Sequence, residues 1–267
     1  MRKLQKKFFG IFFFIVLCSG CATVHHDTVP GIIVDKRESA PAANTFYSLP
    51  DQGRERPFDR RTITHQVAPG ETLWRLAKIY DVSPQAIIAE NNLKNDQDLH
   101  IGQTLRISQA ASPRDVVQLY PSSKWEYIVI HHSATDEGSS LDFNKAHLQK
   151  GWDQGVGYHF VIDNGTKTKR DGQIEATPRW IKQLDGAHCK ASEMNRRAIG
   201  ICLVGNFNIS EPTIRQMQSL VDLVSALRQY YRIPFKNIIG HGHVEGAATD
   251  CPGKQFPWKE FLHRLIK

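Results

Sequence analysis

Hydrophobic and polar residues follow regular patterns in two regions of the chain. The first region, residues 63–108, begins and ends with alternating segments that predict strands at 64–67 and 99–107. Between them, apolar residues at helical spacing predict one helix, and Ser83 followed by Pro84 marks the start of a second. The pattern therefore predicts a small domain with the order strand, helix, helix, strand.

The second region, residues 125–267, alternates β-branched runs with helical patterns. The runs predict four strands, at 126–132, 157–163, 198–205 and 237–240. The third run is apolar on both faces, which is typical of a central strand. Ser210 is the expected N-cap of the longest helix, whose apolar stripe extends to Pro234. Strands alternating with helices predict an α/β fold, with a mixed central sheet flanked by helices.

The remaining segments lack such patterns. Residues 1–20 are basic and then apolar, but the apolar run is too short for a membrane span and is typical of a signal peptide. We expect residues 21–62 to be a tether and 109–124 to be a linker. Ser19 and Gly20 before Cys21 resemble a bacterial lipobox, which implies acylation of Cys21, although Cys18 stands where leucine is usual. An ordinary signal peptide cleaved nearby is the alternative.

Composition and charge narrow the classes of partner. The chain has 34 Lys and Arg against 27 Asp and Glu, a net charge of +7. Removing the four basic residues of the signal segment from this balance leaves +3. So small an excess gives no reason to expect a nucleic-acid partner. The five cysteines are too few for a disulfide framework, and whether Cys189 and Cys202 pair stays open.

Residues 63–108 resemble a LysM domain. The resemblance is carried by Val67, the Gly70-Glu71-Thr72-Leu73 turn, Asn91-Asn92-Leu93 and the Ile101-Gly102-Gln103 segment. It implies binding of N-acetylglucosamine chains of peptidoglycan in a shallow groove between two loops. The residues implied to line that groove are Gly70, Glu71, Thr72, Leu73, Leu99, His100 and Ile101. The apolar ones among them could instead serve the core, because so small a domain has few residues to bury.

Three residues of the second region are candidate metal ligands. His131 lies at the end of a predicted strand, His241 directly follows another, and Cys251 comes shortly after. Two imidazoles and a thiolate suit zinc and leave a fourth position open for water, as a hydrolytic site requires. The spacing alone is a weak signal, since single His and Cys residues are more often simply packed or exposed.

Longer motifs give these residues a context. They are Ile128 to Thr135, Gly157-Tyr158-His159-Phe160, Gly186-Ala187-His188, Ile199 to Phe207, and Gly240-His241 with Thr249-Asp250-Cys251-Pro252-Gly253. In this order they resemble the zinc N-acetylmuramoyl-L-alanine amidases of the phage-lysozyme and peptidoglycan-recognition type. The resemblance implies Zn²⁺ held by His131, His241 and Cys251. It also implies that Tyr158 orients or stabilises the transition state, and Thr249 falls where recognition-type amidases carry threonine.

Some positions leave alternatives open. Neighbouring strand residues point to opposite faces, so His131 and His132 cannot both reach one metal, and the motif selects His131. Cys202 stands where some relatives carry glutamate, so the general base is open, with Glu245 as one alternative. His243 is a rival ligand. We expect His188 to line the substrate groove, although a packed histidine is an equal alternative.

These expectations combine into a hypothesis for the whole chain. It would be an exported, monomeric lipoprotein of the outer membrane that faces the periplasm and cuts the amide bond between N-acetylmuramic acid and L-alanine. The LysM domain would hold it on peptidoglycan. Two alternatives belong to other classes: a recognition protein that binds peptidoglycan without cutting it, and a cysteine hydrolase that uses Cys251 with a histidine. Cys251 and Tyr158 together favour the zinc enzyme.

Overall fold

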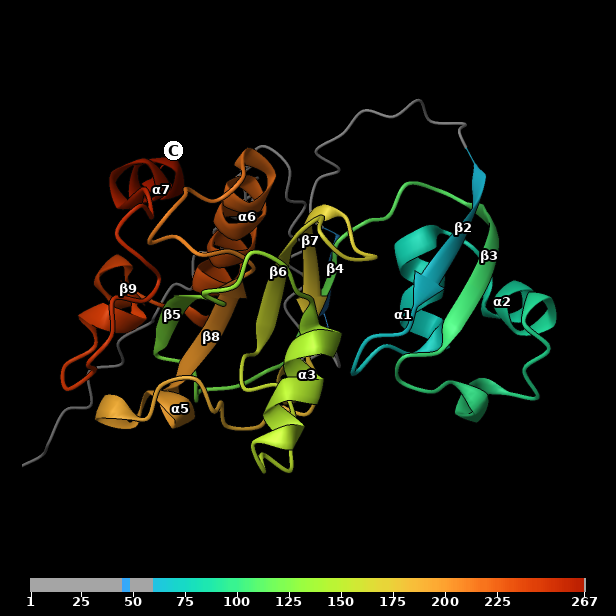
Figure 1. Ribbon diagram of the computed structural model, residues 1–267, viewed down its shortest axis with the longest axis horizontal. Coiled ribbons are helices and arrows are strands. Elements are labelled where there is room, and N and C mark those ends of the chain that lie inside the picture. Colours follow the sequence, from blue (N-terminus) through green and yellow to red (C-terminus); the bar gives the residue numbers. More distant parts are fainter. Residues whose placement is uncertain (1–44, 49–59, 267) are drawn as a thin grey trace, which may run out of the picture. The chain divides into compact units, whose positions relative to one another are not determined.

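A computed structural model describes residues 45–48 and 60–266 of the chain (Figure 1). The signal segment 1–20, Cys21 and most of the expected tether lie outside these residues, so the expectations for them stay predictions. Among the residues described, no helix has the length and apolar character needed to cross a membrane.

The LysM region folds in the predicted order of elements. Strand β2 (Arg61–Gln66) pairs antiparallel with β3 (Thr104–Ala110), and helices α1 (Leu73–Tyr80) and α2 (Pro84–Glu90) lie between them in sequence. The hydroxyl of Ser83 accepts a hydrogen bond from Ala86 N, so the predicted N-cap is confirmed. Side chains from all four elements share one apolar core, which includes the fully buried Leu76, Ile87 and Leu105.

The second region is built on a five-stranded mixed sheet. Its strand order is β7-β6-β8-β5-β9, and every neighbouring pair is parallel except β6 and β7. The strands are β5 (Tyr127–His132), β6 (Phe160–Asn164), β7 (Asp171–Ala176), β8 (Ala198–Leu203) and β9 (Ile238–Gly240). The mixed sheet and the central place of the strand in 198–205 are confirmed. That strand, β8, is buried along its whole length, as a central strand should be.

The two faces of the sheet contact different helices. Ile128 and Ile130 of β5 share a core with the buried side of α6 (Ile214–Tyr231), which lies along one face (Figure 1). Val129 lies in a separate cluster with Met194 of α5 (Met194–Arg197). Because side chains alternate along a strand, His131 belongs to the face of Val129, away from α6.

The remaining helices are short. The α-helices are α3 (Ser140–Gln149), α4 (Pro178–Ile181) and α7 (Trp258–Ile266). The 3₁₀ helices are η1 (Asp96–Asp98), η2 (Ala191–Glu193), η3 (Phe235–Asn237) and η4 (His241–His243).

Regular structure extends into segments expected to be a tether and a linker. Strand β1 (Thr45–Ser48) pairs antiparallel with β4 (Val116–Leu119). Val117 and Leu119 are buried in the core of the amidase-like region, which explains why part of the expected linker is ordered. The strand is only four residues long and Gln118 is its one polar residue, so its sequence shows no clear alternation.

Two further differences concern the second region. Strand β7 was missed because its sequence, Asp171 to Ala176, is rich in residues that are uncommon in strands, and pairing with β6 compensates for them. The N-cap of α6 is Thr213 and not Ser210: Thr213 Oγ1 accepts a hydrogen bond from Gln216 N, and the Gln216 side chain accepts one from Thr213 N. This reciprocal pair is a capping box.

The cap of α6 gives a test of stability. Thr213→Ala removes the capping bond and also the hydrogen bond that Thr213 donates to Asp171 of β7. We expect the free energy of unfolding to fall by about 1–2 kcal/mol in urea titrations. Ser210→Ala is the matched control, because Ser210 is exposed, and its effect should stay within about 0.5 kcal/mol. Equal effects of the two variants would contradict the assignment of the cap.

Candidate active site

Two histidines meet because neighbouring strands are in register. Ile130 of β5 pairs with Gly240 of β9 in a parallel ladder. The next residues, His131 and His241, therefore emerge side by side at the carboxyl ends of the two strands, and their ring centroids are 4.7 Å apart. Sequence alone placed each histidine at a strand end, but only the strand order makes them neighbours.

A backbone hydrogen bond brings Cys251 close to His131 and His241. Gly242 N donates to the carbonyl of Cys251 at 2.6 Å, and a Cβ on Gly242 would collide with the carbonyl of Thr249. Cys251 Sγ then lies 3.6 Å from His131 Nδ1 and accepts a hydrogen bond from the backbone N–H of His132. The ligand atoms of His131, His241 and Cys251 all lie within 4.8 Å of one another.

The chemistry of this cluster fits a metal ion. Burial, together with the neighbouring His188 and His241, holds the pKa of His131 well below its usual value, and burial also lowers the pKa of His241. Both rings are therefore neutral near pH 7, the form that can coordinate a metal. Burial raises the pKa of the Cys251 thiol to about 12, against the opposing hydrogen bond from His132. The thiol therefore keeps its proton near pH 7, and a bound cation would displace that proton. Two imidazoles with one thiolate suit Zn²⁺.

His188 is buried behind His131. It is only 8% exposed, and its Nδ1 is 3.1 Å from His131 Nε2, while its Nε2 is 3.3 Å from the carbonyl of Ala198. The carbonyl can only accept, so His188 Nε2 carries a proton and its Nδ1 accepts from His131 Nε2–H. That chain of bonds leaves His131 Nδ1, the nitrogen nearer Cys251, free to bind a metal. The sequence motif identified His188 without indicating this orientation.

Tyr158 adds a proton donor beside the ligand cluster. It precedes β6, and its ring centroid lies 5.2 Å from that of His131. Burial, together with the nearby Cys202 and Cys251, raises the pKa of the phenol well above its usual value, so the hydroxyl keeps its proton. Cys202 is fully buried in β8, in register with His131, and forms a hydrogen bond with Tyr158. Cys189, Cys202 and Cys251 are all free thiols in the structure.

The other candidates of the same region take different places. His132 points to the opposite face and accepts a hydrogen bond from Phe207 N, in keeping with strand alternation. His243 is exposed beside Trp258 and lies outside the ligand cluster, so the structure does not bring this rival ligand to the site. Glu245 is exposed. Thr249 is exposed too, and its hydroxyl accepts a hydrogen bond from Cys251 N.

A cavity of about 310 Å³ opens beside the loop that carries Cys251. Its lining includes Thr249, Asp250, Lys254 and Trp258. A polar hollow next to the ligand cluster gives room for a substrate group, with one acidic and one basic side chain at its wall.

The residues expected to line the LysM groove differ in their exposure. Thr72, His100 and Ile101 are exposed, and Gly70, Glu71 and Leu99 are half-buried. Leu73 is 2% exposed and belongs to the domain core, so burial removes it from the groove surface. The backbone of Val67 bonds to both Gly102 and Gln103, which holds the two loops next to each other.

The role of His188 gives a test of metal affinity. His188→Ala removes the acceptor that orients His131, and we expect Zn²⁺ affinity to fall about 10- to 100-fold in competition with a chelator. His243→Ala is the matched control on an exposed histidine near the cluster and should leave the affinity unchanged. A loss with His243→Ala that equals the loss with His188→Ala would contradict the assignment of the ligands.

Comparison with known proteins adds a family to this geometry. A family model described as N-acetylmuramoyl-L-alanine amidase matches residues 121–254, and a LysM domain model matches residues 65–108. Peptidoglycan-recognition protein SC2 of Drosophila melanogaster is 30% identical over 143 residues, which span 50% of this chain and 71% of that protein. The probable endopeptidase p60 of Listeria monocytogenes is 41% identical over 89 residues, 28% of this chain and 18% of that protein.

Solved structures include N-acetylmuramoyl-L-alanine amidase LysC from Clostridium intestinale. It is 34% identical, with a TM-score of 0.45, and the match covers 54% of this chain and 89% of that one. From the match over residues 121–254, the chain belongs to the N-acetylmuramoyl-L-alanine amidase family, and it also carries a LysM domain.

Proposed function

We propose that the protein is a zinc-dependent peptidoglycan amidase, which hydrolyses the amide bond between N-acetylmuramic acid and the L-alanine of the stem peptide. The observation that carries this proposal is the cluster of His131, His241 and Cys251 with the protonated Tyr158 beside it. Family membership supports the choice of bond.

The three ligands would hold Zn²⁺ and leave room for water or a carbonyl oxygen. When bound, the ion supplies Lewis acidity and lowers the pKa of water to about 7, which makes hydroxide available near neutral pH. His131 is oriented for this task by His188, and Cys251 is kept in place by Gly242 N. The donor set is the same in type as that of known catalytic zinc sites, in which protein ligands fill three of four positions.

Tyr158 is suited to stabilise the transition state. Attack on an amide carbonyl places negative charge on its oxygen, and a nearby hydrogen-bond donor stabilises that charge. The phenol of Tyr158 keeps its proton because of burial and the neighbouring cysteines. Its hydroxyl is therefore a donor throughout the pH range in which the enzyme would work.

Thr249 is proposed to assist at the same site. Its hydroxyl oxygen accepts from Cys251 N, so its own hydrogen stays available for the substrate. This position beside a ligand agrees with a role in orienting the substrate or the attacking water. Glu245 is the alternative general base, and its exposed side chain shares the loop between His241 and Cys251.

Two other functions remain as alternatives, each with its own prediction. A recognition protein would bind peptidoglycan without releasing product, and relatives called peptidoglycan-recognition proteins make this the second candidate. A cysteine hydrolase would need a thiolate at Cys251, yet burial raises the pKa of that thiol to about 12. The complete ligand set together with Tyr158 favours the zinc enzyme.

The place of action is proposed to be the cell wall. LysM and amidase domains both fit an exported protein that works on peptidoglycan. A lipid at Cys21 would anchor the chain to the outer membrane on its periplasmic side, with residues 22–62 as the spacer, and we expect a monomer. Binding of the LysM domain to glycan would raise the local concentration of the scissile bond.

Isolated sacculi provide the direct test of the reaction. We expect the protein to release free stem peptides that begin with L-alanine, identified by mass. Release should stop with a zinc chelator and return with added Zn²⁺. Sacculus binding without release, by protein shown to contain zinc, would favour the recognition protein. Release that resists chelation but stops after thiol alkylation would favour the cysteine hydrolase.

The proposed donor is tested by Tyr158→Phe. Losing the hydroxyl should lower kcat about 100-fold or more, because one oxyanion donor is typically worth that much. Zinc content should be unchanged, since Tyr158 is outside the ligand cluster. Tyr127→Phe is the matched control: this tyrosine lies on β5 with its ring under Arg197. A Tyr158→Phe variant as fast as the parent would remove Tyr158 from the mechanism.

A further inference from the structure

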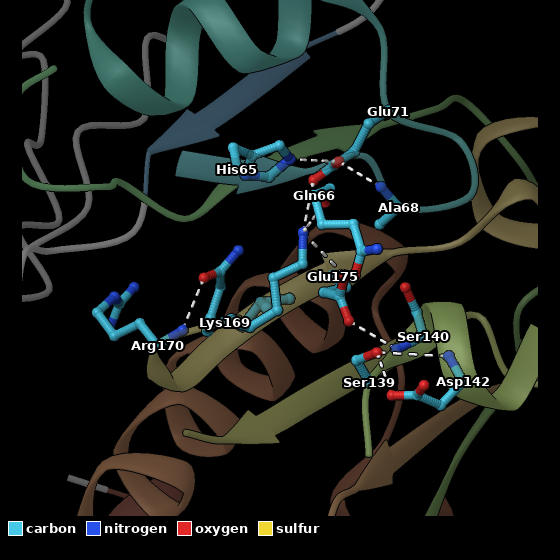
Figure 2. Close-up of polar contacts among 12 residues, drawn as sticks. His65, Gln66, Ala68, Glu71, Ser139, Ser140, Asp142, Lys169, Arg170 and Glu175 are labelled. Atoms are coloured by element: carbon cyan, nitrogen blue, oxygen red, sulfur yellow. Dashed lines mark hydrogen bonds and ion pairs between the residues drawn. The ribbon is translucent and has the colours of Figure 1, made fainter. Parts of the chain in front are cut away.

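A buried lysine of the amidase domain bonds to the LysM domain. Lys169 lies in the loop between β6 and β7, and its side chain is only 3% exposed. Its Nζ donates to the carbonyl of Gln66 at 3.1 Å and lies 3.4 Å from Glu71 Oε1, and both of these partners belong to the LysM domain. On the amidase side, the same Nζ lies 3.6 Å from Glu175 Oε2 (Figure 2).

The charged groups around Lys169 explain how its side chain can be buried. Burial alone would raise the pKa of Glu71, but its hydrogen bond and attraction to His65, with the charge of Lys169, lower it to about 2. Burial and the neighbouring Glu175 raise the pKa of Asp163, which is therefore protonated. Burial opposes the charge of Lys169, but the neighbouring Glu71 and Glu175, one from each domain, raise its pKa, so Lys169 remains a cation.

An apolar contact lies beside this ion pair. Gly70, the residue before Glu71, faces Ile181 and Pro178 of α4 so closely that a Cβ would lie 2.6 Å from Ile181 Cδ1. Gly70 also has a φ of +84°, a conformation that side chains rarely adopt. The turn of Gly70 and Glu71 is therefore pressed against the amidase domain by both polar and apolar contacts.

The contact is built so that it can open. Glu71 keeps two partners inside the LysM domain, His65 and the backbone N–H of Ala68, both at 2.7 Å. On the amidase side, Glu175 keeps a hydrogen bond from Ser140 N at 2.7 Å (Figure 2). Separation would therefore break the bonds of Lys169 to Gln66 and Glu71 while each carboxylate kept a partner in its own domain, so neither is left as a buried, unpaired charge.

We propose that Lys169 is a latch: it docks the LysM domain through the Gly70–Glu71 turn, and a glycan strand containing N-acetylglucosamine that engages this turn competes with it. The glycan part rests on the proposed function, which assigns the same turn to sugar binding. In the docked state one rim of the groove, at His100 and Ile101, is exposed, and the rim at Gly70 and Glu71 is half covered. The full groove forms on release, so glycan binding and release are linked.

The test uses Lys169→Met in the full chain, with Lys145→Met as the control on an exposed lysine of α3. Hydrogen exchange at the amides of residues 66–73 should become faster in Lys169→Met and stay unchanged in Lys145→Met. A pentamer of N-acetylglucosamine should bind the Lys169→Met variant at least about threefold more tightly than the parent, because the cost of releasing the turn from Lys169 no longer opposes binding. Ile181→Gln, which replaces the apolar side chain facing Gly70 without adding a charge, should act in the same direction.

The parent protein supplies an independent measurement. By linkage, the pentamer should speed amide exchange in residues 166–181 of the parent, where the latch lies. Unchanged exchange at residues 66–73 in both Lys169→Met and Ile181→Gln would overturn the latch. Faster exchange with unchanged pentamer affinity would overturn the competition. If the pentamer bound neither the parent nor the variants, the proposed glycan binding by the LysM domain would be wrong, and so would the competition. The exchange rates of Lys169→Met would then still test whether Lys169 docks the LysM domain.

Discussion

The register between β5 and β9 is the constraint on which the candidate site depends. Pairing of Ile130 with Gly240 fixes His131 and His241 as neighbours at the carboxyl ends of parallel strands. A shift of one residue in this register would turn one histidine to the opposite face of the sheet. The buried β8 on the other side of β5 helps to hold that register, since its whole length is enclosed in the core.

The remaining parts of the site are supports for this pair. The hydrogen bond from Gly242 N brings Cys251 back to the strand ends, and His188 fixes the ring of His131. Burial keeps the imidazoles neutral and Tyr158 protonated. A hydrolytic metal site needs neutral imidazoles as ligands and a proton donor beside them. Burial at the strand ends provides both.

Sequence reasoning predicted the fold class and the residues of the ligand cluster, because strand periodicity and short motifs are local properties. It missed β7, whose polar residues become a strand only through pairing with β6. It left open whether His188 lines the groove or is packed, since the contact with His131 joins residues far apart in sequence. Lys169 gave no local signal of its contact with the LysM domain, because Gln66 and Glu71 lie far from it in sequence. Contacts of this kind form only when the chain is folded, so local sequence patterns do not reveal them.

Zinc K-edge X-ray absorption of the full chain, loaded with one equivalent of Zn²⁺, tests the central claim most directly. The account predicts one sulfur ligand at ~2.3 Å and two imidazole nitrogens at ~2.0–2.1 Å, with the remaining position taken by a light atom. A spectrum without sulfur would contradict the role of Cys251. Two sulfur ligands would contradict the set of two imidazoles and one thiolate, because a second cysteine would then be bound to the metal.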